Sequence, residues 1–193
     1  MRMRSCIIRL MTPRTGAVEN SFATLRVTMP EMPLLPAVTL GAVSGMRAMM
    51  APAVISWAAR RNGLNLDGGH FSAFKGAGIA KTAAALMMGE MVADKTPFVP
   101  NRTDPGALIT RALSGGAAGM AAFKARRRSV VLGAAIGAAA AVGAAYAAMH
   151  LRKKAAEHFH VPDRTVALVE DGIALAAGLI AVSFLKDREA ETE

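Results

Sequence analysis

Ionisable side chains inside otherwise apolar stretches are the residues of this sequence whose types and placement could support chemistry. A charge in apolar surroundings is costly unless it is paired or hydrated, so such residues usually have a purpose. Acids and bases brought together there can bind an ion or a small solute, or they can act as ion pairs that hold helices together. Both interpretations stay open at this level. The candidate polar site consists of Arg47, Glu90, Asp94, Lys95, Arg111, Glu170 and Asp171.

Five apolar stretches must position these residues: 33–59, 76–93, 106–123, 129–149 and 166–185. A helix that crosses a bilayer needs ~20 mostly apolar residues. The fourth and fifth stretches fit this length well, the first fits if Arg47 is tolerated, and the second and third are marginal. The sequence predicts an all-α fold, a polytopic membrane bundle of four or five Ala/Gly-rich helices. The alternative is a soluble Ala-rich helical bundle.

The parity of the crossings predicts where the charges meet. If all five stretches cross, the second ends and the third begins on the same face of the membrane, which brings Glu90, Asp94, Lys95 and Arg111 together. The fourth ends and the fifth begins there too, which adds Glu170 and Asp171, and Arg47 reaches down from that face. Glu90 and Asp94 are four residues apart and therefore share a helix face.

Composition and charge exclude several other classes of protein. Only 19% of the residues are charged and 53% are hydrophobic, whereas about 25% are charged in a typical soluble domain. The net charge of +9 is gathered in clusters at 124–128 and 152–154, at the ends of apolar stretches. Anionic lipid headgroups and the positive-inside rule explain such clusters. We therefore expect membrane lipids as partners and no nucleic acid.

Glycines spaced four apart recur in three of the stretches. Both members of such a pair lie on one helix face and let a neighbouring helix approach closely. This spacing predicts helix packing, within the bundle or in a homo-oligomer. The residues concerned are Gly41, Gly45, Gly115, Gly119, Gly133 and Gly137.

The organisation expected is a disordered basic tail over 1–32, a membrane-embedded helical domain over 33–185, and a charged tail over 186–193. Whether the first tail is native stays open at this level. The single cysteine excludes an internal disulfide. No nucleophile, phosphate-binding or dinucleotide motif is present, so we expect no enzyme activity, no cofactor and no metal. The expected location is a bacterial cytoplasmic membrane.

Several short motifs occur in order along the apolar stretches. The motifs are Gly41-x-x-x-Gly45-Met46-Arg47 with Pro52, Gly89-Glu90-x-x-x-Asp94-Lys95-x-Pro97, Arg102-Thr103, Arg111-Ala112-Leu113-Ser114-Gly115 and Glu170-Asp171. Together they resemble a known family of small bacterial membrane proteins, the domain-of-unknown-function family numbered four-one-two-six. The resemblance covers roughly 34–183 and implies a multi-pass membrane location, without an activity or a catalytic residue.

Two functional hypotheses follow from the charged residues. The first is a small transporter or channel-like protein in which the candidate polar site binds an ion or small solute. The second is a non-catalytic membrane scaffold or assembly partner, in which the same charges are structural ion pairs.

Overall fold

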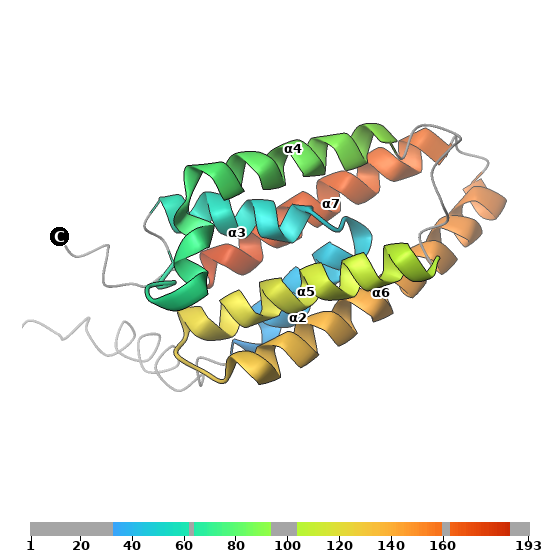
Figure 1. Cartoon of the computed structure of the whole chain (residues 1–193). Helices are drawn as coiled ribbons and strands as arrows, with labels where there is room; N and C mark the ends of the chain where they lie inside the picture. The colour runs from blue at the N-terminus through green and yellow to red at the C-terminus, as the bar shows by residue number, and fades with distance from the viewer. Residues whose placement is uncertain (1–32, 62–63, 94–103, 160–162, 186–193) are drawn as a thin grey trace, which may run out of the picture. The chain divides into compact units, whose positions relative to one another are not determined.

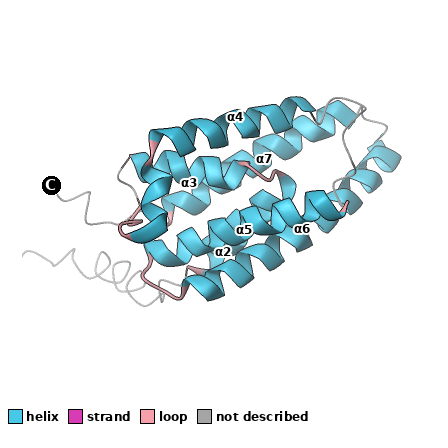
Figure 2. Cartoon of the chain, in the orientation of Figure 1, coloured by secondary structure: helices cyan, strands magenta, loops and turns pink. Residues whose placement is uncertain are grey.

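The computed structural model describes residues 33–61, 64–93, 104–159 and 163–185. Every regular element in these ranges is a helix, which confirms the all-α class (Figure 2). The two predicted tails, 1–32 and 186–193, lie outside the described residues, as do Asp94 and Lys95 of the candidate polar site.

The helices follow the apolar stretches of the sequence, with one exception (Figure 1). The expectation of one helix over 33–59 is wrong, because this stretch forms two helices interrupted at Arg47. The connection between Arg60 and Ala77 also contains a short 3-10 helix that was not predicted. The elements are α2 (Leu34–Met46), α3 (Met50–Arg60), η1 (Gly69–Lys75), α4 (Ala77–Ala93), α5 (Pro105–Ala125), α6 (Val130–Phe159) and α7 (Asp163–Ser183).

Glycine faces hold α2 and α5 against α6, and these three helices make the most extensive contacts of the bundle. A Cβ atom added to Gly41 would lie 2.5 Å from the carbonyl oxygen of Gly137, and one added to Gly133 would lie 2.5 Å from that of Gly119. No side chain fits at such a distance. The structure places all six glycines singled out in the sequence in these contacts, which let the helix backbones approach closely.

The other helices surround this group. α3 packs against α4, η1 and α7, and α7 also contacts α2. The apolar core lies where these helices meet, and it includes Leu40, Val43, Ile55 and Val182. The extensive contacts of α4 are with α3 and η1, so α3 is the main link between α4 and the glycine-packed helices.

Two helices of the described part are long and apolar enough to cross a membrane. They are Val130–Arg152 within α6 and Thr165–Ser183 within α7, and each contains an 18-residue stretch with a mean hydropathy of 1.9. Only 22% of the residues of the first 18-residue stretch and 33% of those of the second are buried, whereas an apolar core helix of a soluble protein would be mostly buried. Their outer faces therefore expose apolar side chains. α2 is apolar as well but shorter.

The glycine contacts predict that Gly137→Ala destabilises the bundle while Gly143→Ala on the same helix does not. A Cβ atom at position 137 would strike the α5 backbone, and one at position 143 would meet nothing within 4 Å. Overpacking costs about 1–3 kcal/mol, whereas Ala in a helix interior gains about 0.5–1 kcal/mol over Gly. The midpoint of thermal unfolding in detergent should fall for the first variant only. Equal midpoints would contradict the packing.

Candidate functional site

The interruption between α2 and α3 is the centre of the candidate site. α2 ends at Met46, and Arg47 is extended, with φ −139° and ψ 111°, before α3 begins at Met50. Pro52 explains the position of this break. A proline is tolerated in the first turn of a helix, but its ring would clash with the carbonyl group four residues earlier, that of Ala48, if the helix were continuous.

The carbonyl group of Ala48 is satisfied by a side chain from another helix. Pro52 has no N–H group to donate to it, and the hydroxyl of Ser114 on α5 donates a hydrogen bond to it instead. The same hydroxyl lies 3.3 Å from the Oγ of Ser44, which is fully buried on α2. Sequence reasoning missed both serines, although Pro52 pointed to a break and hence to a carbonyl group in need of a donor.

Glu90 of α4 satisfies the two amide groups at the break. The N–H of Ala48 donates to its Oε1 at 3.0 Å, and the N–H of Met49 donates to its Oε2 at 3.2 Å. The carboxylate therefore takes the role of an N-terminal cap of α3, supplied from a different helix. The first N–H groups of a helix have no partner within the helix, and the helix dipole favours a negative charge beside them.

Arg47 points into the bundle and pairs with α7. Its Nε donates to Oδ1 of Asp171 at 2.5 Å, and its Nη1 lies 3.5 Å from the carbonyl oxygen of Glu90. The side chains of Arg47 and Asp171 are 1% and 5% exposed. A buried charge of either sign is stable only with such a partner. The second carboxylate oxygen of Asp171, Oδ2, accepts no hydrogen bond within the described part of the chain.

Arg111 of α5 completes the charge balance of the site. Its Nη2 lies 3.9 Å from Oε1 of Glu90, and its side chain is 7% exposed. Two arginines thus face two carboxylates, contributed by the break and by α4, α5 and α7. The Glu90 side chain, 20% exposed, is the most accessible of the four charged groups.

The structure brings four of the seven predicted site residues together: Arg47, Glu90, Arg111 and Asp171. Glu170 precedes Asp171 on α7 and is half-buried, and its side chain points in a different direction because neighbouring residues of a helix do not share a face. Asp94 and Lys95 lie outside the described residues. Among the described residues, no three His, Cys, Asp or Glu side chains are placed to hold a metal ion.

The helical region that builds this site coincides with a known protein family. The family described as "Domain of unknown function (DUF4126)" matches residues 34–184. The chain belongs to this family. The resemblance inferred from the sequence motifs is thereby confirmed. The DUF4126 match runs from the first residue of α2 to just beyond α7, so it includes every residue of the site. No curated protein and no solved structure matches the chain.

The buried pair of this DUF4126 protein should show strong coupling in a double-mutant cycle. Arg47→Met or Asp171→Leu alone leaves one charge buried without its partner, which costs about 3–5 kcal/mol. The double variant removes both charges, so its loss of stability should be clearly smaller than the sum of the two single losses. Thermal unfolding in detergent measures all three variants.

The exposed pair of Lys75 and Asp67, 2.6 Å apart, is the matched control. Asp67 is 76% exposed, so Asp67→Ala should cost less than about 1 kcal/mol. Additive losses for Arg47 and Asp171 would show that the two side chains do not form a mutually dependent pair.

Proposed function

We propose that this protein is a multi-pass membrane protein that moves an ion or small solute, and that the helix break with its four charged groups is the binding site. The observation that carries the proposal is a carboxylate, Glu90, that caps a broken helix from a neighbouring helix beside two buried arginines. Interrupted helices whose free ends face ions or charged substrates are a recurrent device of secondary transporters.

The apolar outer surface supports the membrane location. α6 and α7 expose large apolar side chains, such as Val131 and Leu168, along segments long enough to span a bilayer. α4 also exposes apolar residues, including Leu86 and Val92. Exposed large apolar side chains on three helices favour lipid over water as the surrounding medium. The α2–α3 pair, α4 and α5 then complete a bundle of five segments.

Basic residues suggest the orientation. Lys124 lies in the last turn of α5, and the connection from α5 to α6 contains the run Arg126–Arg128. Short loops rich in Lys and Arg stay on the cytoplasmic side of the membrane. This rule favours a cytoplasmic position for that connection, and we propose a cytoplasmic membrane as the location of the protein.

The mechanism that the geometry supports is competition for Glu90. In the structure described here, the N-terminus of α3 and Arg111 neutralise this carboxylate. A proton or a bound cation at Glu90 would weaken its hold on the amide groups of Ala48 and Met49. The α3–α4 pair would then be free to shift about the extended residue Arg47, while α2 remains held by its glycine contacts with α6.

Glu90→Gln tests transport directly. The variant keeps the size of the side chain and removes the charge that a cation or proton must compete for. Flux is measured in vesicles loaded with a pH-sensitive dye and given Na⁺, K⁺ or proton gradients, and separately with a panel of small solutes. The flux through the variant should be at least about tenfold lower than the flux through the wild-type protein, as expected for loss of a charge-assisted interaction. Asp67→Asn, which removes an exposed carboxylate, should leave flux unchanged. Equal flux by Glu90→Gln and wild type would exclude the site.

The burial of the cluster favours a second candidate function, a membrane scaffold or assembly partner. The side chains of Arg47, Asp171 and Arg111 are at most 7% exposed, and the cluster pairs its charges internally. Under this alternative, the protein supports no flux above that of empty vesicles. Glu90→Gln then lowers the midpoint of thermal unfolding and has no other effect.

A further inference from the structure

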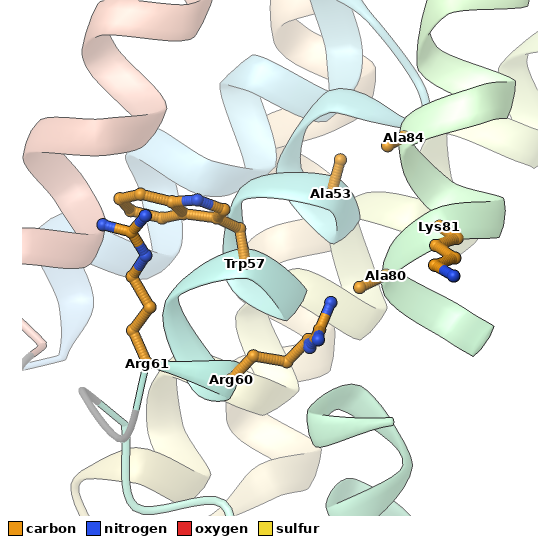
Figure 3. A pocket seen from close by; sticks show the side chains of 7 residues that line it. All are labelled: Ala53, Trp57, Arg60, Arg61, Ala80, Lys81 and Ala84. Carbon is orange, nitrogen blue, oxygen red and sulfur yellow. The ribbon is translucent and has the colours of Figure 1, made fainter. Parts of the chain in front are cut away.

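A pocket of about 490 Å³ lies between α3 and α4, at the end of α3 opposite the helix break. Figure 3 shows Arg60 extending into the space between the two helices, while Arg61 turns back over the ring of Trp57. The pocket belongs to neither the charged cluster nor the glycine contacts. It is lined by Ala53, Trp57, Arg60, Arg61, Ala80, Lys81 and Ala84.

The charges of this pocket are all positive. Three of its seven lining residues are cations, and none is an acid. The guanidinium of Arg61 lies 4.5 Å from the centre of the Trp57 ring, which fixes its position. Neither Arg60 nor Lys81 forms an ion pair with any residue in the described ranges. Cations that share one pocket repel one another, and an anion bound between them would remove this repulsion.

One face of α3 and the facing side of α4 form the pocket, as the spacing of the lining residues indicates. Ala53, Trp57 and Arg60 are separated by four and three residues and therefore share a face of α3, and Arg61 directly follows the helix. The small side chains of Ala80 and Ala84, four apart on α4, leave room opposite them. The result is an apolar floor with cationic groups and an indole ring at the rim.

We infer that this pocket binds a phosphate-bearing anion. Arginine presents a planar fork of donors that matches two phosphate oxygens, and a lysine ammonium adds a point charge from the facing helix. Two sources supply a ligand of this chemistry, the headgroup of an anionic phospholipid and a free phosphate group. Trp57 beside basic residues at the end of an apolar bundle is typical of the membrane interface, where lipid headgroups lie.

The inference does not depend on transport, because it involves neither Glu90 nor the break between α2 and α3. It concerns a separate surface of the same bundle. A failure of the transport experiment therefore leaves it intact, and its own failure leaves the transport proposal intact.

Two binding measurements on the full chain in detergent test the inference. In the first, native mass spectrometry counts retained phosphatidylglycerol and, separately, retained phosphatidylcholine. In the second, isothermal titration measures the binding of inorganic phosphate. Each is applied to wild type, to Lys81→Gln, and to the double variant Arg60→Gln/Lys81→Gln. A second double variant, Lys75→Gln/Arg128→Gln, removes the same number of charges outside the pocket and serves as the matched control.

We expect the affinity for one of the two phosphate probes to fall at least about tenfold in Arg60→Gln/Lys81→Gln and to stay unchanged in the control variant. Loss of phosphatidylglycerol binding would identify a lipid headgroup, and loss of inorganic phosphate binding would identify a free anion. The inference would be overturned if all variants had equal affinity for both probes. It would also be overturned if the protein retained phosphatidylglycerol and phosphatidylcholine equally and bound no inorganic phosphate. The exposed single variant Lys81→Gln, expected to weaken binding by a smaller factor, keeps the test valid if the double variant does not fold.

Discussion

The need to neutralise charge and backbone polarity in an apolar bundle is the constraint on which the rest of this structure depends. The break between α2 and α3 exposes two amide groups and one carbonyl group among apolar helices, and an unsatisfied polar group is expensive there. Glu90 accepts both N–H groups, and Ser114 donates to the carbonyl group. Arg47 then finds its counter-charge in Asp171. One interruption in one helix thus connects side chains from α4, α5 and α7.

The glycine contacts and the charged cluster hold different helices of the fold together. The contacts of α2 and α5 with α6 are made almost backbone to backbone, so they leave little room for relative movement of these helices. α3 and α4 are joined to that group through ordinary side-chain packing and through the polar contacts of Glu90. The α2–α5–α6 group is therefore rigid, whereas the position of the α3–α4 pair depends on the Glu90 carboxylate. Such a pair can take one position when the carboxylate binds the amide groups and another when it does not. This division underlies the proposal that occupancy of Glu90 by a cation or proton shifts the α3–α4 pair.

Much of the fold followed from the sequence because the apolar stretches are bounded by polar residues and glycine. The all-α class, four of the five helical stretches and the family were predicted correctly. The single helix over 33–59 was not, because hydropathy averages over a stretch and does not register that Pro52 forbids the i to i−4 geometry at Ala48. The meeting of Arg47, Glu90, Arg111 and Asp171 could be anticipated from the parity of crossings. The backbone groups that bind Glu90, and the serines at positions 44 and 114, could not, since they become visible only once the break is known.

Glu90 holds the start of α3 through the amide groups of Ala48 and Met49. Hydrogen–deuterium exchange of the full chain in lipid nanodiscs, compared between wild type and Glu90→Ala, tests this contact. These two amides should be protected in the wild type and exchange much faster in the variant, while the amides of α6 around Gly137 keep their protection. Unchanged exchange at Ala48 and Met49 in Glu90→Ala would show that Glu90 does not hold the start of α3.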